Sequence, residues 1–162
     1  MIYLDHHATT PVDARVLEAM LPFFTEKFGN AASKQHRFGW DANDAVERAR
    51  KQVAALIGAG SKDIVFTSGA TEANNLAIKG AAKARRGERD HLVTIATEHK
   101  AVLDPIAVLA KDGWRTTVLP VSASGVIDVG VVADAITERT ALVSVMAAKK
   151  EIGVVQPIKE LA

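Results

Sequence analysis

The sequence predicts an α/β protein built on a mostly parallel sheet with flanking helices. From residue 63 onward, short runs rich in Val, Ile and Thr alternate with segments of helical periodicity, and short turns join them. Alternation at these lengths favours parallel strands connected by right-handed crossovers. The 162 residues are 48% hydrophobic, and a chain of this size can bury a hydrophobic core.

The composition argues against several classes of protein. The sequence has 20 lysines and arginines against 19 aspartates and glutamates, whereas a dedicated nucleic-acid binder needs clustered basic residues. No apolar run approaches the ~20 residues that span a bilayer, and the first residues turn polar too soon for a signal peptide. The sequence contains no cysteine, so it offers no disulfide and no thiol chemistry. We therefore expect a cytoplasmic protein without nucleic-acid or membrane partners.

The first part of the chain predicts two helices. Asp13 is a suitable N-cap for a helix that runs to about Lys27, and Pro22 should kink or shorten this helix. A longer helix is predicted over residues 39–57, where apolar residues recur at helical spacing and charged residues take the opposite side. Gly58 is a suitable end for it.

Strands and helices alternate along the rest of the chain. Each predicted strand is short and β-branched or apolar, and a turn or a helical pattern follows it. Ligands of parallel sheets bind beyond the carboxyl ends of the strands, so the loops at those ends are candidate functional loops. The predicted strands cover residues 63–67, 91–96, 115–119 and 141–146. One predicted helix ends near residue 86, and two others cover residues 101–111 and 128–137.

The first of these loops, residues 68–75, leads into a helix through a glycine. Free backbone N–H groups at the start of that helix, together with the Thr71 hydroxyl, could hold a phosphate. The alternative is that Ser68 or Thr71 only caps the helix, with Glu72 favourable to the helix dipole. The loop matches neither the Walker A pattern nor the GxGxxG pattern.

Histidines and lysines follow two other strands and the N-terminus. His99 could stack on a planar cofactor, move a proton or cap the next helix. Lys149 and Lys150 would meet a phosphate or a carbonyl group, or else remain solvated charges. His6 and His7 hint at metal binding, but adjacent side chains rarely converge on one ion, so we predict no metal site.

Six motifs in register resemble one enzyme family. They are YLDHHATTPVD, FGNAAS, HRFGW, IVFTSGATEANNLAIKG, TEHKAVLDP and EIGVVQPI. Together they resemble the N-terminal portion of the NifS/IscS-type cysteine desulfurases, which are pyridoxal-phosphate enzymes of the class V aminotransferase group and of fold type I. The resemblance covers essentially the whole chain. It implies a partial fold type I large domain, with residues 1–12 as an N-terminal arm and residues 13–162 as the N-terminal part of that domain.

The resemblance also implies a site. Ala70 and Thr71 match the loop that binds the cofactor phosphate, and His99 matches the histidine that stacks on the pyridine ring and assists proton transfer. Lys150 stands where the family has an asparagine that contacts the cofactor. It could react with the cofactor carbonyl itself, or it could be a solvated or disruptive charge. The implied cofactor is pyridoxal 5′-phosphate, and the implied reaction converts L-cysteine into alanine and a persulfide for iron–sulfur cluster assembly.

The chain departs from the family in length and in its missing cysteine. It has well under half of the family's usual length, and the Schiff-base lysine and the nucleophilic cysteine fall outside the matched motifs. We therefore expect the chain alone not to complete the reaction. The alternatives are a non-catalytic truncated module that binds a partner chain, phosphate or the cofactor, one half of a split enzyme, or a related lyase such as a selenocysteine lyase. The expected partners are a second copy or a complementing chain, and a sulfur-acceptor scaffold protein.

Overall fold

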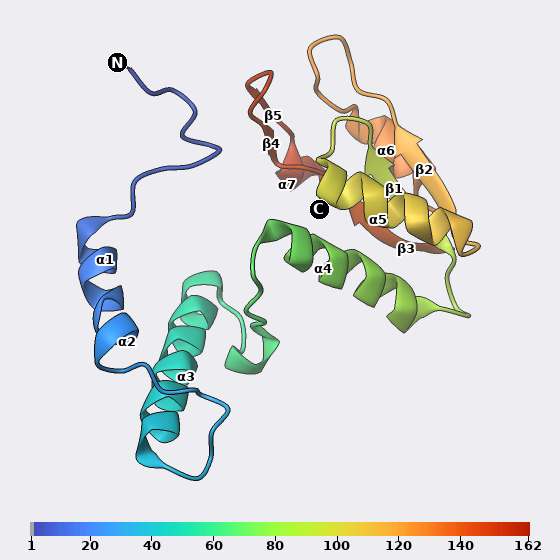
Figure 1. Ribbon diagram of the computed structural model, residues 1–162. Helices are drawn as coiled ribbons and strands as arrows, with labels where there is room; N and C mark the ends of the chain where they lie inside the picture. The colour runs from blue at the N-terminus through green and yellow to red at the C-terminus, as the bar shows by residue number, and fades with distance from the viewer. Residues whose placement is uncertain (1) are drawn as a thin grey trace. The chain divides into compact units, whose positions relative to one another are not determined.

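The computed structural model describes residues 2–162. The chain divides into two compact units, unit 1 (Met1–Phe66) and unit 2 (Thr67–Ala162). Unit 1 is helical, and unit 2 holds a sheet with its helices (Figure 1). None of the helices in residues 2–162 combines the length and the apolar character that a membrane crossing requires. The division into an arm of residues 1–12 and a large-domain part of residues 13–162 stays a prediction.

The helix signals in unit 1 are confirmed. The Asp13 carboxylate accepts a hydrogen bond of 2.9 Å from the Arg15 backbone N–H and so caps the first helix. Pro22 splits the predicted helix in two and becomes the first residue of the second piece. Gly58 ends the long helix with a φ of 68°. The elements are α1 (Ala14–Met20), α2 (Pro22–Thr25), α3 (Arg37–Ile57) and the 3₁₀ helix η1 (Ser61–Asp63).

The predicted strand at residues 63–67 is wrong. Asp63 closes η1, and Ile64 has an extended backbone with φ −88° and ψ 124° but belongs to no strand. A strand needs the backbone of a neighbour to satisfy its polar groups. Here the Arg50 guanidinium donates to the Ile64 carbonyl instead, and it also stacks over the Phe66 ring at 5.0 Å from the ring centre. A side chain from α3 therefore takes the place of a partner strand.

The glycines of the FGNAAS and HRFGW motifs lie at points of close packing inside unit 1. A Cβ on Gly29 would lie 2.1 Å from the Phe38 carbonyl oxygen, and a Cβ on Gly39 would lie 1.9 Å from the Ser33 carbonyl oxygen. Neither distance is possible for a real side chain, so each glycine lets two backbone segments approach. The loop before α3 and the first turn of α3 are thereby packed against each other.

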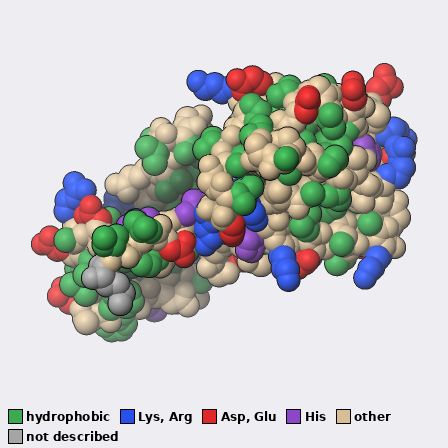
Figure 2. All heavy atoms as spheres, turned by 90° about the horizontal axis from the view of Figure 1, so that it is seen from above, with side chains coloured by type: hydrophobic (Ala, Val, Ile, Leu, Met, Phe, Trp, Pro, Cys, Tyr) green, Lys and Arg blue, Asp and Glu red, His purple; other side chains and the backbone are tan. Residues whose placement is uncertain are grey.

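Unit 1 leaves many large apolar side chains uncovered. Phe24 is 69% exposed, Trp40 is 55% exposed and Leu56 is 85% exposed. Apolar side chains stand at the molecular surface in Figure 2 as well. Large apolar side chains that a helical unit leaves exposed are typical of a region that contacts further protein.

Unit 2 confirms the parallel sheet. Its strands run in the order β2–β1–β3, and β1 pairs in parallel with both neighbours. The crossovers are the helices α5 and α6, as the alternating pattern predicts. The elements are α4 (Ala70–Arg85), β1 (His91–Ile95), α5 (Lys100–Lys111), β2 (Arg115–Leu119), α6 (Val129–Ala135), β3 (Thr140–Ser144), β4 (Ala148–Lys149), β5 (Val154–Val155) and α7 (Ile158–Leu161).

The central strand β1 sends side chains into two cores. All five of its residues are buried. Leu92 joins a cluster with Ile78 of α4 and Ile106 of α5. Val93, on the opposite face of the strand, joins a second cluster with Val132 of α6. Unit 2 is thus layered, with α4 and α5 on one face of the sheet and α6 on the other (Figure 1).

A hairpin that the sequence did not predict follows β3. Strands β4 and β5 pair antiparallel beyond residue 146, where the sequence predicts no further strand. Buried Gln156 anchors the end of the hairpin, because its side-chain oxygen accepts from the Ile127 N–H at 2.9 Å and its amide donates to the Gly125 carbonyl at 2.8 Å. A hydrogen bond of 2.8 Å from the Gly125 N–H to the Ser122 carbonyl closes the turn that contains Gly125.

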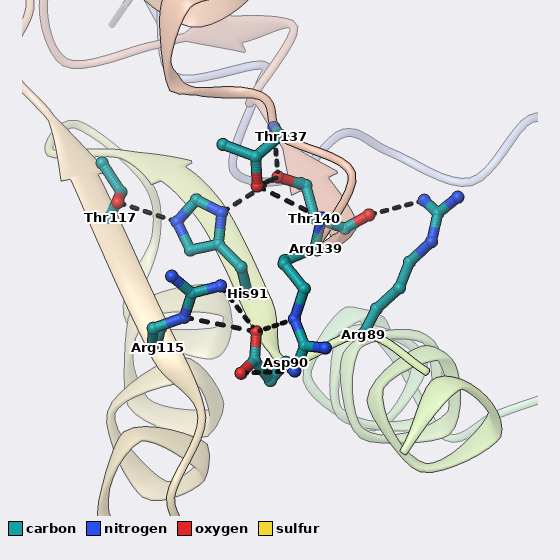
Figure 3. Close-up of polar contacts among 8 residues, drawn as sticks. All are labelled: Arg89, Asp90, His91, Arg115, Thr117, Thr137, Arg139 and Thr140. Atoms are coloured by element: carbon teal, nitrogen blue, oxygen red, sulfur yellow. Dashed lines mark hydrogen bonds and ion pairs between the residues drawn. The ribbon is translucent and has the colours of Figure 1, made fainter. Parts of the chain in front are cut away.

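A polar cluster joins the amino ends of the three parallel strands (Figure 3). The His91 ring lies in the centre of it, with Nδ1 at 2.9 Å from the Thr140 hydroxyl of β3 and Nε2 at 2.8 Å from the Thr117 hydroxyl of β2. Beside it, the Asp90 carboxylate forms ion pairs of 2.8 Å with Arg115 and with Arg139. Hydrogen bonds from these two arginines, Arg139 first, hold the pKa of Asp90 well below its ordinary value. Side chains at the amino end of β1 therefore bond to both neighbouring strands.

The neutral form of His91 suits this cluster. The Thr137 backbone N–H donates to the Thr140 hydroxyl at 2.9 Å, and the proton of that hydroxyl can be donated to Nδ1 of His91. With Nδ1 as the acceptor, the proton of the neutral ring sits on Nε2 and is donated to Thr117. Burial lowers the pKa of His91, the positive charge of Arg115 lowers it further, and Asp90 opposes both.

We predict that His91 makes the protein less stable in mild acid. Because its pKa is lower in the folded chain than in the unfolded chain, the unfolded chain binds more protons below the ordinary histidine value of about 6.5. The stability is fully present above about pH 6.5 and declines as the pH falls below it, by at most about 1.4 kcal/mol per pH unit for one proton. Urea unfolding between pH 7.5 and 5 measures this slope.

Two glutamine variants test this prediction, one at His91 and one at His7 as the control. His91→Gln should reduce the slope, since glutamine does not titrate, whereas His7→Gln, at an exposed position, should keep the slope of the parent chain. An unchanged slope in H91Q would show that His91 does not cause the loss of stability in mild acid.

Candidate functional site

The candidate site lies where α4 meets the start of α5. Thr71, Asn75 and Lys79 follow one another at intervals of four residues along α4 and so share one face of that helix. His99 lies immediately before α5. These side chains line one hollow of about 360 Å³. The other residues that line it are Lys100, Ala101, Asp104, Pro105 and Val108.

The N-terminus of α4 offers unused backbone donors. Its N-cap is Gly69, so neither Ser68 nor Thr71 is the capping residue. The Ser68 N–H and hydroxyl donate instead to the Glu72 carboxylate at 2.6 and 2.7 Å, and these two bonds lower the pKa of Glu72. Helix geometry leaves the N–H groups of Ala70 and Thr71 without an acceptor inside the helix. An anion in front of α4 would accept from them with the favourable end of the helix dipole.

His99 combines a cap with an available ring nitrogen. Its Nδ1 accepts from the Ala101 backbone N–H at 3.0 Å, which confirms the capping alternative. Because Nδ1 is an acceptor, the proton of the neutral ring must sit on Nε2. The ring is exposed and lines the hollow together with Thr71. His99 can therefore cap α5 through Nδ1 and contact a ligand through Nε2 at the same time.

The structure does not bring Lys150 into this hollow. Lys150 is exposed in the turn between β4 and β5, and it is not among the side chains that line the hollow. Its neighbour Lys149 is more enclosed, with a side chain that is 21% exposed and an Nζ at 3.5 Å from a Glu151 carboxylate oxygen. A role of Lys150 at the cofactor stays a prediction.

Sequence reasoning missed three residues near this site. Asn75 and Lys79 could have been found, because residues four and eight positions after Thr71 share its helix face. Buried Glu98, which precedes His99, carries no such local signal. Residues 2–162 contain no group of three or more histidine or acidic side chains placed to hold a metal ion.

Comparison with known proteins gives one consistent result. Residues 2–162 match the family model described as aminotransferase class-V. The chain is 57% identical over 160 residues to the cysteine desulfurase IscS of Rickettsia felis and 56% identical to that of Rickettsia bellii. Each match covers 99% of the chain but only 39% of the relative. The chain thus spans about two fifths of the length of these curated relatives.

Solved structures agree with the sequence matches. The structure of a NifS-like protein superposes with a TM-score of 0.91 at 39% identity, over 99% of this chain and 44% of that one. The structure of SspA in complex with cysteine gives a TM-score of 0.89 at 40% identity, over 99% of this chain and 46% of that one. The fold of these residues is therefore that of NifS-like proteins.

We predict that the capping bond of His99 Nδ1 contributes to stability independently of the rest of the ring. His99→Ala removes the N-cap of α5 and should cost about 1 kcal/mol in the free energy of unfolding. His99→Asn restores an acceptor for the Ala101 N–H and should recover most of that loss, although it removes the ring. Urea unfolding of both variants measures the difference. Equal destabilisation by alanine and asparagine would show that the capping bond does not contribute.

Proposed function

Because the chain belongs to the aminotransferase class-V family, we propose that it is the N-terminal part of a cysteine desulfurase that uses pyridoxal 5′-phosphate. Identity of 57% to a curated cysteine desulfurase supports the proposal. The observation that carries it is that Thr71 and His99, which come from different elements, line one hollow. Since the chain spans 39% of that relative, the activity, substrate and partners of the whole protein are all part of the proposal.

The hollow and the start of α4, where Ala70 lies just before Thr71, fit the cofactor. The volume of the hollow, about 360 Å³, lies within the usual range of small-molecule sites. The N–H groups of Ala70 and Thr71, together with the Thr71 hydroxyl, would hold the phosphate, and Lys79 adds a positive charge along the same face. Lys150 is proposed to approach the cofactor from the β4–β5 hairpin, and its place in the family motif is the only support for that contact.

His99 would act on the bound ring. When bound, the cofactor supplies an electron sink that weakens bonds at the α-carbon of an amino-acid substrate. The Ala101 N–H fixes Nδ1 of His99, so the orientation of the imidazole is set by the start of α5. Nε2 then carries the proton that the ring can donate to a ligand and accept again. His99 is therefore the residue proposed to move a proton in this part of the site.

The proposed substrate is L-cysteine, and the products are alanine and a persulfide for iron–sulfur cluster assembly. One of the similar structures, that of SspA, is a complex with cysteine. The 162 residues contain no cysteine, so the thiolate that accepts the sulfur must come from outside them. A second copy or a complementing chain is the proposed partner, and the apolar side chains exposed on unit 1 support it. A sulfur-acceptor scaffold protein and a location in the cytoplasm complete the proposal.

The missing cysteine supports a second candidate. A chain without a thiol can bind the cofactor, a phosphate or a partner chain without turnover, either as a non-catalytic module or as one half of a split enzyme. Both candidates share the same cofactor site. In the first candidate the remaining groups belong to the same polypeptide. In the second candidate a separate polypeptide supplies them, or no turnover takes place.

We predict that Thr71 contributes to cofactor binding. Thr71→Ala removes a hydroxyl donor from the phosphate and should weaken the binding of pyridoxal 5′-phosphate by about tenfold, since hydrogen bonds to charged groups are the stronger ones. Thr71→Ser keeps the hydroxyl and should bind like the parent chain. Fluorescence titration measures the affinities, with Thr25→Ala in unit 1 as the matched control. Equal affinities of T71A and T25A would argue against this site.

We predict that the 162-residue chain alone releases no alanine from L-cysteine. Persulfide formation needs a cysteine thiolate as nucleophile, and these residues have none. The assay incubates the purified chain with pyridoxal 5′-phosphate and L-cysteine and measures alanine by chromatography, with a full-length cysteine desulfurase as positive control. Cysteine-dependent alanine release above that of a protein-free mixture of pyridoxal 5′-phosphate and L-cysteine would contradict the prediction.

A further inference from the structure

Gln156 is a buried amide at the base of the β4–β5 hairpin. It is 4% exposed, although glutamine is mostly an exposed residue in proteins. Both ends of its amide are bonded, since the oxygen accepts from the Ile127 N–H at 2.9 Å and the nitrogen donates to the Gly125 carbonyl at 2.8 Å. Its backbone N–H donates to the Ala147 carbonyl at 2.9 Å and closes the base of the hairpin. One residue therefore bonds to the turn after β2 and to the segment after β3.

These two segments leave strands that do not pair with each other. The strand order is β2–β1–β3, so β1 lies between the other two (Figure 1). The residues that pair with β1 end at Leu119 of β2 and at Ser144 of β3. The backbone pairing of the sheet therefore does not join the two segments. The side chain of Gln156 joins them beyond the carboxyl edge of the sheet.

The tip of the hairpin packs against the same turn. Gly125 is buried and has a φ of 84°. A Cβ on Gly125 would lie 2.5 Å from Cδ1 of Ile152 and 3.2 Å from Cγ2 of Val154. The glycine therefore lets the hairpin approach the turn closely. The hairpin is held at two points, by packing of Ile152 at its tip and by the amide of Gln156 at its base.

We propose that Gln156 is a positioning residue that fixes the β4–β5 hairpin, and with it Lys149 and Lys150, against the turn after β2. Without the amide, the Ile127 N–H and the Gly125 carbonyl would be buried without partners, which is costly. Water can replace the amide only if the hairpin moves away from the turn.

The use of this position for a bound cofactor rests on the proposed function, in which Lys150 approaches the cofactor from the hairpin. The contacts of Gln156 with the turn do not rest on it. The two ideas can therefore fail separately.

Backbone hydrogen exchange in the whole 162-residue chain tests the proposal without any ligand. Gln156→Met keeps most of the length and volume of the side chain but removes its acceptor and its donor. This change should lower the protection of the Ile127 N–H and of the backbone N–H of residue 156 by about tenfold or more. The protection of the Val93 N–H in β1 should stay unchanged. Unchanged protection at both of the first two groups would overturn the proposal.

Two further variants separate positioning from general loss of stability. Gln52→Met makes the same change at an exposed position of α3 and should leave all three protections as they are. If Q156M destabilises the whole chain, so that Val93 loses protection equally, Gln156→Asn decides. Its amide is one methylene shorter and cannot reach both partners, so the two groups should lose protection while Val93 keeps it. Unchanged protection at the two groups in Q156N, or an equal loss at Val93, would overturn the proposal.

A second readout follows the position of the hairpin rather than its stability. The nuclear Overhauser effect between the δ1 methyl group of Ile152 and the α protons of Gly125 reports the packing of the tip on the turn. It should keep its intensity in Q52M and lose at least half of it in Q156M, because the hairpin moves away when its base is released. An unchanged intensity in Q156M would overturn the positioning role.

A third readout connects the hairpin to the cofactor. Addition of pyridoxal 5′-phosphate should shift the backbone N–H resonance of Lys150 in the parent chain and in Q52M, and the shift should be at most half as large in Q156M. An equal shift in Q156M would overturn the positioning role. No shift in any variant, with the exchange pattern as expected, would count against the proposed contact of Lys150 with the cofactor but would leave the anchoring of the hairpin by Gln156 supported.

Discussion

The bridge that His91 makes across the sheet is the interaction on which the rest of unit 2 depends. β1 is the only one of the three parallel strands with two strand neighbours in the described residues, and it is buried along its whole length. The His91 ring contacts a threonine hydroxyl on each neighbour, while Asp90 pairs with an arginine from each side. These bonds satisfy polar groups that would otherwise be costly to bury. They also set the position of the strand that leads to the candidate site.

The two edges of the sheet have different roles. At the amino edge, side chains from all three strands hydrogen-bond to one another, and both nitrogens of the His91 ring are used in those contacts. At the carboxyl edge, the strands separate. Glu98 and His99 follow β1, and Lys149 lies in β4, which follows β3. Parallel sheets commonly bind ligands at this edge, because the strand ends and helix N-termini converge there. A rigid amino edge and an open carboxyl edge together give a site that is exposed but held in place.

Local sequence signals predicted much of the fold. The features that depend on contacts between distant parts of the chain were not predicted. The cap at Asp13, the break at Pro22, the end at Gly58 and the three parallel strands all follow from residue type and periodicity. The strand at residues 63–67 failed because pairing depends on a neighbouring backbone, and Arg50 takes the Ile64 carbonyl instead. The resemblance assigns Thr71 and His99 to one site, and both side chains line one hollow. The burial of Glu98 depends on how the folded chain packs around the end of β1, so no local pattern could reveal it.

The central claim is that the start of α4 and the start of α5 form one cofactor site. A crystal structure of the chain grown with pyridoxal 5′-phosphate tests it most directly. We expect the phosphate in front of α4, within hydrogen-bond distance of the Ala70 and Thr71 N–H groups, with the pyridine ring beside His99. A phosphate bound elsewhere, or a ring without contact to His99, would contradict it.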